Sequence, residues 1–155
     1  MTELPRYSNE TEIEEVVSRF ERRDYAPEEF FHARHLTVTA WYFLQFDAPV
    51  ARERMRAGLV KFISHHGRHG FHETITEFWL RMVELQVLMA RGAGLNCVAT
   101  VNDAIARLGD KNLIYSHYSK EKLGSQEAKA KSVATDLKPL PDGSRNGISS
   151  WPVRR

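Results

Sequence analysis

Apolar residues recur at helical spacing along most of the chain. Ile13, Val16, Val17 and Phe20 fall at positions i, i+3, i+4 and i+7, on one face of an α-helix. No stretch alternates apolar and polar residues over the length of a β-strand. The pattern predicts helices over residues 9–23, about 27–46, from 47 to just before the loop at Gly67, about 71–91 and about 97–108.

The predicted helix over residues 27–46 is apolar almost all round. It carries Phe30, Leu36, Trp41 and Leu44 among other large side chains. A helix of this kind has neighbours on most of its sides, so we expect it at the centre of the bundle.

Residues that can cap helices precede several predicted elements. Asn9 is followed three residues later by Glu12, as in a capping box. Asp47 comes just before Pro49, a residue favoured in the first helical turn. Asn96 directly precedes the predicted helix over residues 97–108 and can cap it. These caps support the predicted helix starts.

The helical pattern weakens from Asp110 onward. Ser119 and Ser125 each predict the cap of a single-turn helix, and the segment after Asp136 is rich in Pro, Gly and Ser. We expect residues 110–141 to form an irregular arm packed on the bundle, and residues 142–155 to form a flexible tail. The expected fold is all-α: a compact bundle of about five helices in one domain, residues 1–141, with an extended or short-helical C-terminal arm.

Composition narrows the class of protein. The chain has 155 residues, 42% hydrophobic and 27% charged, which is ordinary for a globular domain. Its 22 basic and 20 acidic residues give a net charge of +2 without a basic stripe, which argues against nucleic acid as a partner. No apolar run approaches the roughly 20 residues of a membrane helix, and the polar N-terminus is unlike a signal peptide. With a single cysteine, Cys97, we expect a cytoplasmic protein without a membrane partner.

Histidines gather in two segments of the sequence. Four of the seven lie between Ser64 and Thr76, and two more, His32 and His35, lie upstream. Consecutive helices joined by short loops run antiparallel. The start of the second helix, the end of the third and the start of the fourth then share one end of the bundle. The topology therefore predicts that His32, His35, His66 and His72 reach the same end.

Neutral imidazole is the commonest side-chain ligand of transition metals, and three histidines with one open position form a catalytic arrangement. This favours a divalent metal, Zn, Fe, Mn or Ni, as the cofactor. The candidate ligands are His32, His35, His66 and His72.

Other polar residues have candidate roles around such a centre. Glu73 is the candidate acid or base, and Thr76 a hydrogen-bonding group beside the ligands. His117 could act from the arm as a strap over the pocket, or be a plain turn residue. Arg52 lies near the buried stripe of its helix and is the candidate for binding an anionic cofactor group; the competing role is an ion pair with Glu73 or Asp47.

The sequence also supports a plainer interpretation of these residues. The segment 72–76, HETIT, lacks the second histidine of the zincin HExxH motif, because Thr76 stands in its place. Glu29 and His32 match one half of a di-iron carboxylate bundle, but no second ExxH follows. Each histidine would then be a core or turn residue, hydrogen bonded to a helix-end carbonyl or a carboxylate.

Residues 28–141 carry a set of motifs that resembles a family of small bacterial helical proteins. The shared motifs are FxHxxHLxxxxWxxL, an HG turn, [YF]HETIT, HYSxxxLxSxxA and DLxPLP. In this sequence they begin at Phe30, His66, Phe71, His117 and Asp136. The family pattern has an aromatic residue where residues 131–133 read KSV here. The resemblance groups these residues together and implies that the arm docks on the domain, but it implies no particular activity.

Two functions remain open from the sequence. The first is a metal-dependent enzyme acting on a small molecule through a histidine-rich pocket. The alternative is a non-catalytic helical module with structural histidines, which binds a small molecule or another protein. Assembly into a homo-oligomer is compatible with both.

Overall fold

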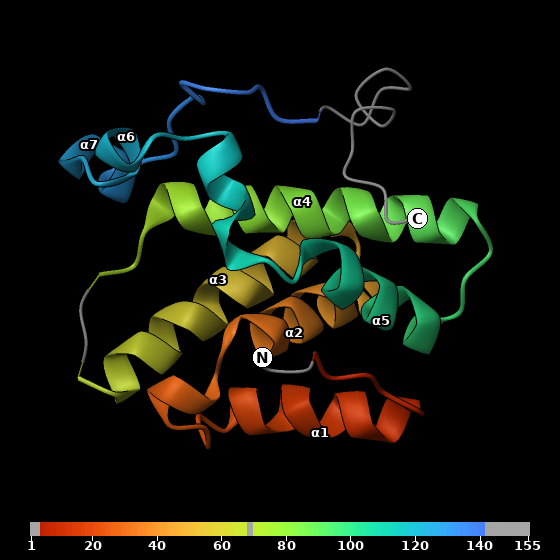
Figure 1. Cartoon of the computed structure of the whole chain (residues 1–155). Helices are drawn as coiled ribbons and strands as arrows, with labels where there is room; N and C mark the ends of the chain where they lie inside the picture. Colours follow the sequence, from red (N-terminus) through yellow and green to blue (C-terminus); the bar gives the residue numbers. More distant parts are fainter. Residues whose placement is uncertain (1–3, 68–69, 142–155) are drawn as a thin grey trace.

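The computed structural model describes residues 4–67 and 70–141, and over these ranges the fold is all-α, as predicted (Figure 1). The elements in chain order are α1 (Glu10–Glu21), η1 (Pro27–Glu29), α2 (His32–Gln45), α3 (Ala48–His65), α4 (Glu73–Gly92), α5 (Cys97–Leu108), η2 (Lys111–Ser116), α6 (Lys120–Leu123) and α7 (Gln126–Ala130). Within the described ranges, no helix combines the length and apolar character needed to cross a membrane.

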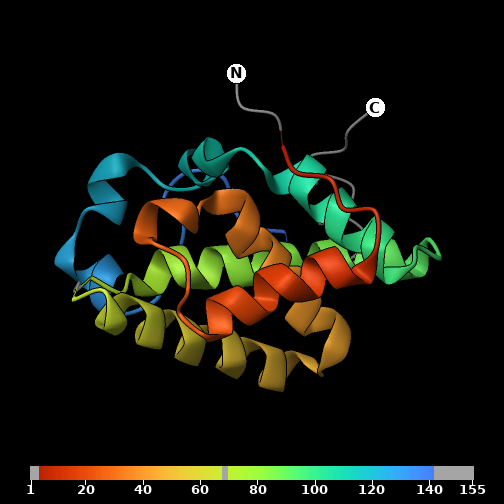
Figure 2. The same cartoon turned by 90° about the horizontal axis from the view of Figure 1, so that it is seen from below.

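The helix α2 lies at the centre and packs against α1, α3, α4 and α5. In the view from below, α1 crosses over α2 on one side while α4 runs on the other (Figure 2). Leu36 and Val38 of α2 are completely buried, as are Met55 of α3 and Met82 of α4. The nearly all-round apolar sequence of α2 is explained by these neighbours.

The predicted helix over residues 27–46 is in fact two elements, which corrects the sequence expectation. Phe30 ends η1 with φ −90° and ψ 63°, outside the helical region, and α2 begins only at His32. The break lets the Phe30 ring stack on Phe20 at 4.7 Å between ring centroids and contact Phe62 at 5.2 Å. Tertiary packing of one aromatic side chain therefore overrides the local helical pattern.

Most predicted caps are present. Asn9, Asn96, Ser119 and Ser125 each accept a hydrogen bond from a main-chain N–H in the first turn of α1, α5, α6 and α7 respectively. Asp47 does occupy the N-cap position of α3, but its side chain makes no capping hydrogen bond.

The arm after α5 folds back over α4, as Figure 1 shows for the segment from η2 to Pro141. Ile114, Tyr118, Leu123 and Ala128 are buried there, so the arm contributes to the core. The residues predicted to form a flexible tail, 142–155, lie outside the described part of the chain.

Candidate functional site

The start of α2, the end of α3 and the start of α4 do face the same end of the molecule. The end of α3 and the start of α4 nevertheless lie apart in different layers (Figure 1). The ion pair between Arg56 and Glu73 (2.6 Å) places the start of α4 beside the middle of α3. From Arg56 to its end at His65, α3 continues for about 14 Å along its axis. His66 and His72 therefore lie at different positions along the axis of α3, although both flank the short connection between α3 and α4.

His72 is the N-cap residue of α4, and both of its ring nitrogens are engaged. Nδ1 accepts a hydrogen bond from the Ile75 N–H at 3.2 Å, and Nε2 donates to the Leu123 carbonyl at 2.8 Å. This pair of bonds sets the neutral tautomer with the proton on Nε2. A metal bound to either nitrogen would have to displace a main-chain partner.

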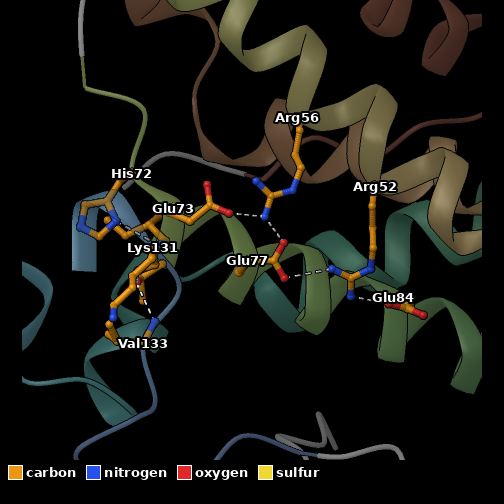
Figure 3. Close-up of polar contacts among 10 residues, drawn as sticks. Arg52, Arg56, His72, Glu73, Glu77, Glu84, Lys131 and Val133 are labelled. Atoms are coloured by element: carbon orange, nitrogen blue, oxygen red, sulfur yellow. Dashed lines mark hydrogen bonds and ion pairs between the residues drawn. The ribbon is translucent and has the colours of Figure 1, made fainter. Parts of the chain in front are cut away.

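Thr74 fastens the arm two residues further along. Its buried Oγ1 lies 2.7 Å from the Ala128 carbonyl and 3.0 Å from the Lys131 carbonyl, and it accepts from the Val133 N–H at 3.2 Å. The arm segment with Lys131 and Val133 lies beside His72 in Figure 3. One hydroxyl thus satisfies several main-chain groups of the arm, and sequence reasoning did not single it out.

His117 and Tyr118 hold the arm from its other side. His117 is 4% exposed; its Nδ1 donates to the Lys138 carbonyl at 2.9 Å and its ring packs against Phe78. The Tyr118 hydroxyl donates to the Val133 carbonyl at 2.6 Å. His117 therefore lies within the arm's own hydrogen-bonding network, bound to a main-chain carbonyl of the arm.

Asp136 completes the closure of the arm. Its carboxylate accepts from the Ser119 N–H at 2.9 Å and from the Ser119 hydroxyl at 2.6 Å. These two hydrogen bonds lower the pKa of Asp136. Arg81 on α4 then donates to the Pro141 carbonyl at 2.8 Å, which ties down the end of the described arm.

His32 caps the far end of α5. Its Nε2 donates to the carbonyl of Leu108, the last residue of α5, at 2.9 Å, and its ring lies edge-on to Trp79 at 4.4 Å. Burial lowers the pKa of His32, although the Leu108 carbonyl acts in the opposite direction. The neutral imidazole thus satisfies one carbonyl that the helix end leaves without a partner.

His35 and His66 keep nitrogens that are not hydrogen bonded within the described ranges. His35 lies 5.8 Å from the Phe30 ring, and burial, with a smaller contribution from His32, lowers the pKa of His35 to about 4. His66 packs edge-on against Phe62 at 4.7 Å, and its buried Nε2 has no hydrogen-bond partner there. His65, which is exposed and contacts the His66 ring edge-on at 5.0 Å, likewise makes no side-chain hydrogen bond within the described ranges.

The remaining candidate residues belong to an ion-pair network between α3 and α4 (Figure 3). Arg52 contacts Glu77 at 3.1 Å and Glu84 at 2.6 Å, so its partners are not the Glu73 or Asp47 expected from sequence. Arg56 contacts both Glu73 and Glu77, and its hydrogen bond with Glu73 is the main cause of its raised pKa. Glu73, the candidate acid or base, is therefore paired with an arginine.

Thr76 is buried at 8% exposure, and its hydroxyl makes no hydrogen bond within residues 4–67 and 70–141. Among these residues, no group of three or more His, Cys, Asp or Glu side chains is placed to hold a metal ion. The structure thus does not bring the predicted ligands His32, His35, His66 and His72 into one coordination shell. His69 lies outside the described ranges.

Comparison with models of known protein families, with curated proteins and with solved structures finds no match for this chain.

Proposed function

We propose that this protein is a non-catalytic helical binding module, in which the motif histidines are structural and hold a C-terminal arm on the bundle. The observation that carries the proposal is the double engagement of His72, whose Nδ1 and Nε2 both bind main-chain groups. His117 and His32 also bind main-chain carbonyls. Catalytic imidazole needs a nitrogen free to take or give a proton, and a metal ligand needs a free lone pair.

The proposal also accounts for the grouping of the motifs. HETIT supplies His72 and Thr74, HYS supplies His117, Tyr118 and Ser119, and the last motif supplies Asp136. In the described structure their polar atoms bind one another's segments. The motif residues occur together because all of them are needed to hold the arm on the bundle. A common substrate is not required to explain their grouping.

A second candidate is the metal-dependent enzyme, and one specific observation favours it. His35 and His66 both lie against the Phe30–Phe62 ring pair and have nitrogens without partners in the described ranges. These two imidazoles are the donors available to a divalent transition metal, although no third described His, Cys, Asp or Glu is placed with them to complete a site.

Metal analysis combined with thermal unfolding separates the two candidates. The full chain is purified without chelators, analysed for Zn, Fe, Mn and Ni, and melted with and without each added metal. The binding module predicts no stoichiometric metal and an unchanged melting temperature for the wild type. It also predicts a lower melting temperature for His72→Ala than for His35→Ala. A stoichiometric metal that is lost in His35→Ala would overturn the proposal in favour of the enzyme.

A further inference from the structure

A hollow of about 700 Å³ lies between α1, the second half of α2 and α3, and no histidine lines it. Figure 2 shows α1 crossing this face of the molecule. The volume is within the range of pockets that hold small molecules. Its charged and aromatic lining residues are Glu14, Glu15, Glu21, Trp41, Tyr42, Phe46 and Arg54.

The charge of this hollow is opposite to that of the whole chain. Three carboxylates, from Glu14, Glu15 and Glu21, face a single guanidinium, whereas the chain carries a net charge of +2. Trp41 is partly buried and packs against the core while still lining the hollow. A carboxylate rim beside an indole face is favourable for an ammonium group.

Glu21 is held in place by Tyr42. The Tyr42 hydroxyl donates to Glu21 Oε2 at 2.7 Å, and Tyr42 itself is 4% exposed. Burial and this hydrogen bond with Glu21 raise the pKa of Tyr42, so it remains a donor. The other carboxylate oxygen of Glu21 makes no hydrogen bond within the described part of the chain, which leaves it available to a ligand.

Arg54 differs from the two arginines beside it on α3. Arg52 and Arg56 are each paired with two carboxylates of α4. Arg54 faces α1 instead; its guanidinium stacks on Phe46 at 4.3 Å and forms no ion pair with any described residue. The stacking orients a guanidinium whose hydrogen-bond donors remain free for a carboxylate or a phosphate.

A second hollow of about 260 Å³ adjoins the first and shares Glu21, Tyr42 and Arg54 with it. Here the balance of charge is reversed, because Arg23 and Lys61 join Arg54 around the one carboxylate of Glu21. The two hollows together form a groove that is acidic and aromatic at one end and basic at the other. We call it the α1 groove.

We propose that the α1 groove binds a small elongated zwitterion. Its ammonium group lies among Glu14, Glu15 and Glu21 against Trp41, and its acid group reaches Arg54 toward Lys61 and Arg23. The inference rests on the proposed binding function and names the chemical class of the ligand. A ligand with only one charge would satisfy one end of the groove and leave the other unpaired.

Calorimetric titration at low ionic strength tests this with probes of matched length. The probes are γ-aminobutyrate and ε-aminocaproate, with hexylamine and hexanoate as singly charged analogues. We expect at least one amino acid to bind in about the millimolar range, and about tenfold more tightly than both analogues. The indole signal of Trp41 in the NMR spectrum should shift with the same affinity.

Matched variants locate the binding. Glu14→Gln combined with Glu15→Gln, and separately Arg54→Gln, should each weaken the zwitterion about tenfold or more. Glu53→Gln, an exposed carboxylate on α3 outside the groove, should leave the affinity unchanged. These lining residues are exposed, so the folded state is preserved and checked by the melting temperature.

Equal or tighter binding of hexylamine, insensitivity to the Glu14 and Glu15 changes, or no binding by any probe would each overturn the proposed ligand class. None of these outcomes bears on metal content or on the stability loss of His72→Ala. A failure of the zwitterion is therefore distinct from a failure of the binding-module proposal.

Discussion

The Nε2 atom of His72 donates a hydrogen bond to the carbonyl of Leu123 at 2.8 Å, across 51 residues of sequence. The bond joins the start of α4 to the end of α6, while Nδ1 of the same ring caps α4 through the Ile75 N–H. One imidazole thus couples a helix start to the closure of the arm, and changes at this position can separate the two roles.

Replacing His72 by Asn should loosen the arm while sparing the helix start. Asn can still accept from the Ile75 N–H as an N-cap, but its shorter side chain cannot reach Leu123. We expect a loss of about 1 kcal/mol in the free energy of unfolding and faster amide exchange over residues 117–138. His72→Ala should lose about 1 kcal/mol more, because the cap is also removed. Equal stability of the two variants would contradict this division of roles.

Thr74→Val should destabilise the protein through lost hydrogen bonds and not through lost volume. The change keeps the shape but removes the hydroxyl that binds Ala128, Lys131 and Val133. We expect a cost of about 1–3 kcal/mol, measured by urea unfolding. Thr76→Val is the matched control, since Thr76 is also buried on α4 and makes no side-chain hydrogen bond within the described ranges. A cost at Thr76 as large as that at Thr74 would show that the hydroxyl contacts are not the cause.

Stability should fall in mild acid because of His35. Its pKa is about 4 in the folded protein against 6.5 as its ordinary value, so the unfolded chain binds the proton more readily. The contribution of His35 is present in full above pH about 6.5, is lost progressively as the pH falls to about 4, and changes no further below that. The loss amounts to about 3 kcal/mol.

Urea unfolding of the wild type and of His35→Gln between pH 4 and pH 7 measures this loss, because glutamine does not titrate. The variant should have the flatter dependence on pH. Parallel curves for the two proteins would place the acid sensitivity at other groups, such as His32, whose pKa is also lowered.

Arg56→Met should weaken the contact between α3 and α4. The guanidinium of Arg56 contacts the carboxylates of Glu73 and Glu77, and its side chain is 25% exposed. Removing it leaves Glu73 without an arginine partner and Glu77 with Arg52 alone, so we expect a loss of about 1 kcal/mol in low salt and less in about 1 M salt. Lys61→Met, an exposed change on the same helix with no ion pair in the described structure, serves as the control. An effect independent of salt would indicate lost packing of the side chain.

Local patterns predicted the fold well, and the reason is physical. The stripe of Ile13, Val16, Val17 and Phe20 is buried as a unit, because helical spacing alone places these side chains on one face. Asn96 caps α5 by accepting a hydrogen bond from the N–H of Ala99, only three residues further along the chain. The break at Phe30 was missed because it depends on Phe20 and Phe62, which are distant in sequence.

The candidate site was less predictable from sequence. Topology brought the histidine-bearing helix ends to one side of the molecule, as expected. The register of α3 against α4 was not readable, since it depends on the long-range pairing of Arg56 with Glu73. The α1 groove was also missed, although Thr11, Glu14, Ser18 and Glu21 form a polar stripe at helical spacing on α1 that could have drawn attention to it.

By itself the sequence determined an all-α protein, most of its helices and caps, and the motif residues that act together. Those features depend on side-chain periodicity and on hydrogen bonds between near neighbours. Only the tertiary structure decided what the motif residues contact: His72 meets Leu123 and His117 meets Lys138, because the arm folds back over α4. An imidazole has the same chemistry whether it binds a metal or holds the arm through a hydrogen bond. Its partners distinguish the two roles, and these partners come from distant parts of the chain.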